Sequence, residues 1–132
     1  CGKTRQPLPF FVAKISAGFP SPADDFVEQK LDLNEFLVKH PAATFFVRVE
    51  GESMIQAGIH SGDLLIVDRA LEPRDQSIVI AVLNGEFMVK RIRNEKGKVF
   101  LAPENPSYHP VELSQAAPFE VWGVVTHVVH PV

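Results

Sequence analysis

The feature that most constrains the fold of this chain is the dipeptide Asn84-Gly85, which stands between two apolar segments. SIVIAVL precedes the dipeptide and EFMVKRI follows it. Asn-Gly is the pair that a two-residue hairpin turn prefers, because both central residues of that turn need positive φ angles. Residues 77–92 are therefore predicted to form an antiparallel β-hairpin.

Strand patterns continue on both sides of this hairpin. TFFVRVE alternates in polarity, and DLLIVD is the continuous apolar run of a strand that is buried on both faces. GKVFLAP is predicted to return from a second hairpin near residues 94–98. PFEVWGVVTHVVH is predicted to form a long last strand, with Gly123 at a bulge. Together these segments predict a mostly-β domain.

The region before residue 44 carries helix signals instead. Ser21-Pro22, followed by two aspartates, predicts a short helix over residues 21–29. A capping-box-like spacing predicts a second short helix within residues 32–40. Residues 1–17 show little periodicity and are predicted to form an N-terminal arm, so that the domain itself covers residues 18–132.

Length and composition describe an ordinary globular protein. The chain has 132 residues, about one domain, with 45% hydrophobic and 22% charged residues. Its net charge of −3 argues against a general binder of nucleic acid or membrane surfaces. The single cysteine, Cys1, excludes an intrachain disulfide and favours a cytoplasmic location. No segment approaches the length of a transmembrane helix, and prolines and Lys14 interrupt the apolar N-terminal run, so a secretory signal is not expected.

Ser53 lies in the glycine-flanked segment GESM, directly after a predicted strand. Such a serine usually forms a turn, its hydroxyl bonded to nearby backbone. The alternative is a nucleophile, because backbone N–H groups around a tight turn can converge on one oxygen atom, as an oxyanion hole requires. A nucleophilic serine also needs a base.

Lys90 is the candidate base. It lies in the middle of the predicted strand EFMVKRI, where its neighbours on the same face are the apolar Met88 and Ile92. An apolar face removes hydration, which lowers the pKa of a lysine and lets its amine accept a proton from a serine hydroxyl. The alternative is a strand lysine whose ammonium group reaches solvent.

The junction Ala17-Gly18 is a third candidate feature, since small residues in an extended segment suit the cleft of a protease. The alternative is an ordinary flexible joint.

Metal binding and direct DNA binding are not expected. No spacing of histidine, cysteine and aspartate resembles a metal site, and a Ser-His-Asp triad finds little support in the five histidines. His127 and His130 are predicted on opposite faces of a strand, and His40, His60 and His109 at the surface. A basic cluster is predicted to be a solvated hairpin edge rather than a nucleic-acid site; it consists of Lys90, Arg91, Arg93, Lys96 and Lys98.

Taken together, these segments resemble the LexA-type family of self-cleaving Ser-Lys proteins, and in particular its UmuD-like branch. The resemblance rests on Ala17-Gly18, FPSPADDFVEQ, LDLNEFL, HPAATFFVRVEGESM, GDLLIVD, NGEFMVKR and FEVWGVVTHVVH, and covers nearly the whole chain from Pro9. GESM with GEFMVKR is specific to the LexA-like class, and GFPSPADDFVEQ narrows it to UmuD-like proteins. UmuD has Cys where this chain has Ala17, but Ala-Gly is the pair in LexA-type repressors.

The resemblance implies a β-rich peptidase domain with short N-terminal helices and a cleavable arm. It implies that Ser53 is the nucleophile, Lys90 the general base and Ala17-Gly18 the scissile bond. The backbone N–H groups of Ser53 and Met54 would form the oxyanion hole, and no cofactor would be needed.

The same resemblance implies a role in the SOS response to DNA damage. Self-cleavage would be stimulated by the RecA–single-stranded DNA filament. The cleaved homodimer would then join a UmuC-like catalytic subunit as the accessory subunit of an error-prone translesion DNA polymerase (polymerase V). A replicative sliding clamp is a further candidate partner, whereas direct contact with DNA or membrane is not expected.

Two alternatives remain open at this point. The first is a catalytically inert interaction module that regulates a polymerase, which predicts no cleavage under any condition. The second is a LexA-like peptidase that acts on other substrates, in the manner of a signal peptidase.

Overall fold

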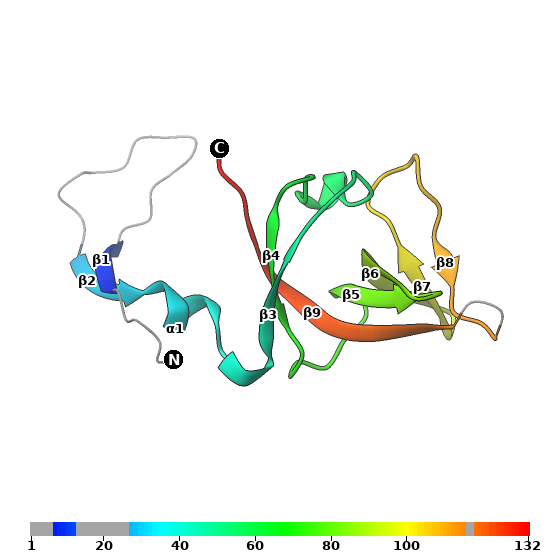
Figure 1. Ribbon diagram of the computed structural model, residues 1–132, viewed down its shortest axis with the longest axis horizontal. Helices are drawn as coiled ribbons and strands as arrows, with labels where there is room; N and C mark the ends of the chain where they lie inside the picture. Colours follow the sequence, from blue (N-terminus) through cyan, green and yellow to red (C-terminus); the bar gives the residue numbers. More distant parts are fainter. Residues whose placement is uncertain (1–6, 13–26, 116–117) are drawn as a thin grey trace. The chain divides into compact units, whose positions relative to one another are not determined.

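The computed structural model describes residues 7–12, 27–115 and 118–132. The chain divides into two units, one ending at Lys39 and the other comprising His40–Val132 (Figure 1). Each unit is held together by its own strand pairing.

In the first unit β1 (Pro7–Val12) pairs antiparallel with β2 (Val27–Asp32), and helix α1 (Leu33–Leu37) follows directly. Helix α1 confirms the second of the two predicted helices. The first predicted helix is wrong over its described part, because residues 27–29 belong to β2. Local capping signals favoured a helix there, but pairing with a distant segment of the arm decides the conformation.

The second unit is a seven-stranded, entirely antiparallel sheet, which confirms the mostly-β prediction. Its strand order is β3-β4-β9-β5-β6-β7-β8. The strands are β3 (Thr44–Arg48), β4 (Leu64–Asp68), β5 (Ile78–Leu83), β6 (Glu86–Glu95), β7 (Lys98–Ala102), β8 (Val111–Glu112) and β9 (Phe119–Val129). Two short 3₁₀ turns, η1 (Pro41–Ala43) and η2 (Ile55–Ala57), flank β3 along the chain.

Both predicted hairpins are present. Asn84 and Gly85 have φ angles of 52° and 77° and join β5 to β6, as a type I′ turn requires. Lys96 and Gly97 likewise have positive φ angles and join β6 to β7. The two-residue strand β8 is too short to leave a sequence pattern, and it was not predicted.

The core consists of two apolar clusters on the sheet. β4 supplies three buried apolar residues in succession, Leu65, Ile66 and Val67, so the continuous apolar run does mark a strand covered on both faces. One cluster centres on Leu65, Val67 and Ile80, and the other on Val79 and Leu101. β3 alternates as predicted, since Phe45 and Val47 pack against the first cluster while Phe46 is exposed.

Strand β9 lies between β4 and β5 and therefore joins two parts of the sheet (Figure 1). Its pairing shifts at two points. Ile80 pairs with Gly123 whereas Ala81 pairs with Val121, which confirms the bulge predicted at this glycine. A second shift occurs against β4, between Ile66 and Val67. In the described part of the chain, no helix is long and apolar enough to cross a membrane.

Candidate active site

The turn that carries Ser53 is anchored by the loop after β7. Gly51 has a φ angle of 97°, which lets the chain reverse soon after β3. The N–H of Glu104 donates to the carbonyl oxygen of Ser53 at 2.8 Å, and Asn105 Nδ2 donates to the carbonyl of Glu52, also at 2.8 Å. These bonds hold the backbone on both sides of the Ser53 side chain.

Lys90 reaches this turn from the middle of β6. Its Nζ lies 2.6 Å from Ser53 Oγ, within hydrogen-bond distance. Met88 and Ile92 belong to the second apolar cluster, as their predicted shared face with Lys90 required. The side chain is half-buried, and burial lowers the pKa of Lys90 below its ordinary value of 10.5. The structure thus brings together the two residues that the sequence singled out, 37 positions apart.

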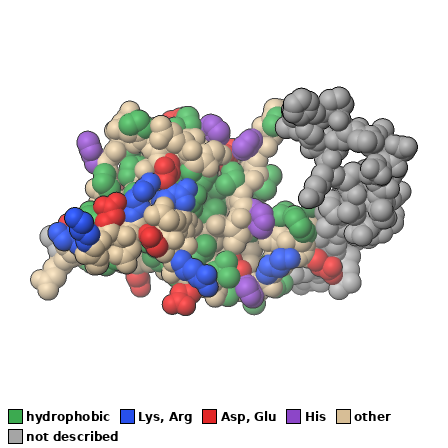
Figure 2. Space-filling model, turned by 180° about the vertical axis from the view of Figure 1, so that it is seen from behind, with side chains coloured by type: hydrophobic (Ala, Val, Ile, Leu, Met, Phe, Trp, Pro, Cys, Tyr) green, Lys and Arg blue, Asp and Glu red, His purple; other side chains and the backbone are tan. Residues whose placement is uncertain are grey.

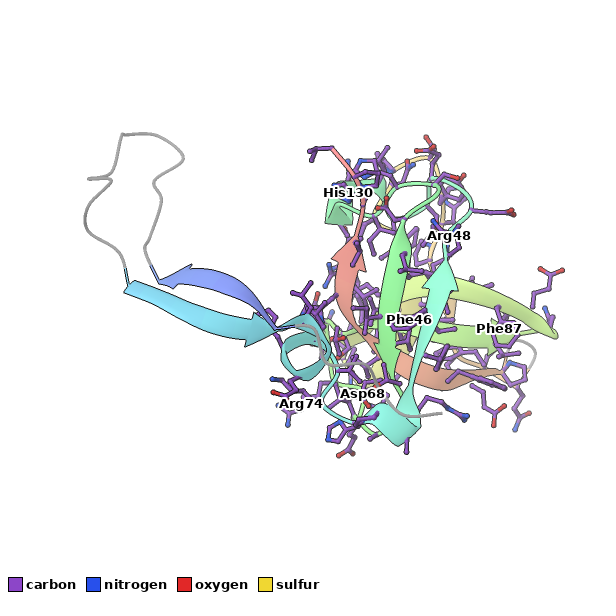
Figure 3. The ribbon with its side chains drawn as sticks, turned by 60° about the vertical axis from the view of Figure 1, so that its left-hand side comes forward. Phe46, Arg48, Asp68, Arg74, Phe87 and His130 are labelled. Carbon is purple, nitrogen blue, oxygen red and sulfur yellow. The ribbon has the colours of Figure 1, made fainter. Side chains whose placement is uncertain are left out.

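A cleft of about 680 Å³ opens beside this pair. Strands β3, β5, β6 and β9 line it mostly with apolar side chains, among them Val47 and Met88. Phe87 and Trp122 meet edge to face there, with ring centroids 5.1 Å apart. Phe87, labelled in Figure 3, lies at the start of β6. The cleft is therefore suited to an extended apolar peptide, with Ser53 and Lys90 at its wall.

The backbone donors predicted for an oxyanion hole are the N–H groups of Ser53 and Met54. Within residues 27–115 and 118–132, no hydrogen bond uses the N–H of Ser53 or of Met54. The Met54 side chain is buried in the first apolar cluster, and this packing holds the turn of Ser53 in place. Both N–H groups are thus available to an oxygen atom beside Ser53 Oγ.

Glu104 is a site residue that sequence reasoning missed. Its carboxylate accepts hydrogen bonds from the guanidinium groups of Arg91 and Arg93 on β6, while its backbone holds Ser53. Glu104 therefore connects the turn of Ser53 with the strand of Lys90. Its position in the loop APENPSY shows no periodicity from which this bridging could have been inferred.

Three of the five members of the basic cluster lie against carboxylates. Glu104 pairs with Arg91 and Arg93, and Lys98 lies 3.9 Å from Glu112. On the face shown in Figure 2, basic and acidic side chains are interspersed.

Three of the five histidines have carboxylate partners that the sequence did not indicate. His40 Nδ1 lies 2.6 Å from Oδ2 of the buried Asp68. His60 and His130 both face Asp63, so three potential metal ligands lie together although no metal-site spacing was found in the sequence. The pair His60 and Asp63, three apart in a turn, was the available signal, but its third member is 67 residues further along the chain.

The predicted junction Ala17-Gly18 lies outside the described residues, as does most of the arm.

Comparisons with known proteins give one family model and several similar proteins. A family model described as peptidase S24-like matches residues 9–126. Protein SamA of Salmonella typhimurium is 48% identical over 125 residues, which are 92% of this chain and 84% of SamA. Protein MucA of Escherichia coli is 45% identical over 130 residues, 95% of this chain and 87% of MucA. LexA repressor 1 of Pseudomonas putida is 39% identical over 102 residues, 77% of this chain but only 50% of the repressor.

Proposed function

The chain belongs to the peptidase S24-like family, and from this premise we propose that it is a serine peptidase that cleaves its own chain between Ala17 and Gly18. The observation that carries the proposal is the 2.6 Å approach of Lys90 Nζ to Ser53 Oγ, made by a lysine whose pKa burial lowers. A turn serine with only a structural role has no need of a partly desolvated amine at its hydroxyl.

In the proposed reaction, neutral Lys90 accepts the hydroxyl proton of Ser53 as Oγ attacks the carbonyl carbon of Ala17. The N–H groups of Ser53 and Met54 stabilise the resulting oxyanion. The Ala17–Gly18 C–N bond then breaks, and the new amine of Gly18 takes the proton from Lys90. Water, deprotonated by the same lysine, hydrolyses the acyl-enzyme, releases the carboxylate of Ala17 and restores Ser53.

The cleft accounts for the choice of substrate in this proposal. Its apolar lining suits the arm sequence PLPFFVAKISA, and small residues at the scissile bond allow close approach to Ser53. Ordering the arm in the cleft costs conformational entropy, so the competent state is sparsely populated in the isolated chain. A partner that favours the docked arm raises the rate by raising that population.

The cellular role that we propose is in the cytoplasmic SOS response. The RecA–single-stranded DNA filament would be the stimulating partner, and the cleaved homodimer would serve a UmuC-like catalytic subunit in error-prone translesion synthesis, with a sliding clamp as a further partner. Similarity to SamA and MucA over most of both chains supports this role, as does similarity to a LexA repressor over the peptidase part.

Intact-mass analysis tests the proposal. The purified chain is incubated at alkaline pH, and separately at neutral pH with an activated RecA filament. Expected are two fragments, residues 1–17 and 18–132. Ser53→Ala and Lys90→Ala should each abolish cutting, whereas Lys98→Ala, a change at an exposed lysine of the neighbouring hairpin, should leave it intact.

Each alternative has its own signature in this experiment. An unchanged mass under both conditions would identify an inert interaction module. Cutting of added peptides but not of the arm would identify a peptidase with other substrates. Normal cutting by Lys90→Ala would remove lysine as the base.

A further inference from the structure

A second cluster of reactive side chains includes neither Ser53 nor Lys90. It consists of His60, Asp63 and His130, whose ligand atoms all lie within 4.8 Å of one another. Asp63 is one of two buried charged residues among those described, and the other, Asp68, is bound by His40. The proposed peptidase reaction uses no member of this cluster.

Strand register brings the cluster together. β4 and β9 are antiparallel, and Leu64 pairs with Val129. Continuing that register by one residue places Asp63, just before β4, opposite His130, just after β9. Figure 3 shows His130 at that end of β9. The contact between residues 67 positions apart is thus set by the sheet rather than by flexible side chains.

The turn that carries the other two members is held by backbone hydrogen bonds. The N–H of His60 donates to Asp63 Oδ2 at 2.8 Å, and the N–H of Asp63 donates to the His60 carbonyl at 3.0 Å. Val49 exchanges backbone hydrogen bonds with Gly62 and Asp63, at 2.7 and 2.9 Å. The carboxylate is therefore fixed in place while the two imidazoles, about half exposed, remain able to adjust.

We propose that His60, Asp63 and His130 form a binding site for a divalent transition-metal ion, of which zinc is the best fit. Two imidazole nitrogens and one carboxylate oxygen form a common three-ligand set for zinc, with water in the fourth position. Metal–ligand bonds of about 2.0–2.2 Å in a tetrahedron place ligand atoms roughly 3.3 Å apart.

The observed spacing is close to that requirement. His130 Nδ1 lies 3.3 Å from Asp63 Oδ2, and His60 Nδ1 lies 3.8 Å from the same oxygen. The two imidazole rings are nearly perpendicular, with centroids 5.6 Å apart, so modest ring rotations bring both nitrogens toward one point. Calcium and magnesium prefer sites made of oxygen ligands, which this cluster does not offer.

Zinc titration of the full chain tests the site. Isothermal calorimetry is performed on the Ser53→Ala chain, which keeps the arm attached, with Cys1→Ser added to remove the single thiol. Zinc binding with one-to-one stoichiometry is expected. Cobalt(II) should give the visible absorption of a four-coordinate site.

Histidine variants give the decisive comparison. His60→Gln and His130→Gln should each weaken zinc binding at least about tenfold, since even outer-shell changes cost that much. His127→Gln, on β9 three residues before His130 and outside the cluster, should bind zinc like the parent. Circular dichroism confirms folding of each variant. Failure of the parent chain to bind zinc one-to-one, or parental affinity in a folded His130→Gln chain, would overturn the assignment, whatever the outcome of the cleavage experiments.

Discussion

Replacement of Gly123 by alanine tests the packing of β9 against β4. A Cβ atom at this position would lie 2.6 Å from Cγ1 of Val67 and 3.3 Å from Cγ of Arg69. Carbon atoms in good contact are about 3.5–4.0 Å apart, so the added methyl group overlaps Val67 by about 1 Å. Val67 is fully buried and cannot move into solvent.

The expected loss of stability follows from this overlap. Overpacking of a well-filled core costs about 1–3 kcal/mol. Replacing glycine also lowers the entropy of the unfolded chain, which returns about 0.4–1 kcal/mol. From the middle of both ranges, about 2 and about 0.7 kcal/mol, the net destabilisation is roughly 1.3 kcal/mol. A unit the size of His40–Val132 should therefore lose roughly 5–10 °C in Tm.

Thermal and urea unfolding of Gly123→Ala measure this loss, and a double-mutant cycle with Val67→Ala assigns its cause. If the methyl group meets Val67, the double variant is more stable than the sum of the single changes predicts, by at least about 0.5 kcal/mol. Gly97→Ala serves as the control, because Gly97 has a φ angle of 79° but nothing within 4 Å. Gly97→Ala should destabilise the protein only through backbone strain, so its loss of stability should add to the loss caused by Val67→Ala. An unchanged Tm for Gly123→Ala, or strict additivity with Val67→Ala, would refute the reasoning.

Three further predictions concern single residues. Because burial lowers the pKa of Lys90, the cleavage rate should rise about tenfold per pH unit and level off below pH 10.5, as followed by mass; a flat profile would contradict a lysine base. Burial raises the pKa of Asp68, but hydrogen bonds from His40 and the Ala70 N–H outweigh it and leave that pKa below 3.8. Its stabilisation is therefore present above pH 3.8 and lost as the pH falls through the lowered pKa, and urea unfolding of Asp68→Asn should lack that part of the acid dependence. Glu104→Gln should lower the free energy of unfolding in urea by about 1–2 kcal/mol, because the Glu104 carboxylate accepts hydrogen bonds from two guanidinium groups. Glu112→Gln, at an exposed pair 3.9 Å apart, should change it by less than about 0.5 kcal/mol. Equal losses in the two variants would contradict this account.

Much of the sheet could be predicted from local patterns. The Asn84-Gly85 turn needs only positive φ angles, and the run at β4 needs only burial on both faces, so each is visible within a short window. The helix expected over residues 21–29 failed where it could be compared, because pairing of β2 with β1 is non-local. Strand identity at β2 depends on a partner that a window of that size does not contain.

The candidate site likewise contains residues that local patterns reveal and residues that depend on distant partners. Ser53 and Lys90 were found because one lies in a glycine-flanked turn, the other lies on an apolar strand face, and both match a family pattern. Glu104 could not be found in this way, since its importance comes from bonds to two separate elements. The cluster around Asp63 depends on the register between β4 and β9, which no spacing in the sequence reveals.

The place of β9 in the sheet also has a consequence for folding during synthesis. The turn of Ser53 follows β3, which pairs with β4, whereas Lys90 lies on β6, which pairs with β5. β9 is the strand between these two pairs, and it follows both of them along the chain. A nascent chain that ends before Phe119 therefore lacks the strand that aligns the two halves of the sheet. In such a chain the turn of Ser53 and the strand of Lys90 belong to two separate strand pairs, which the hydrogen bonds of Glu104 bridge.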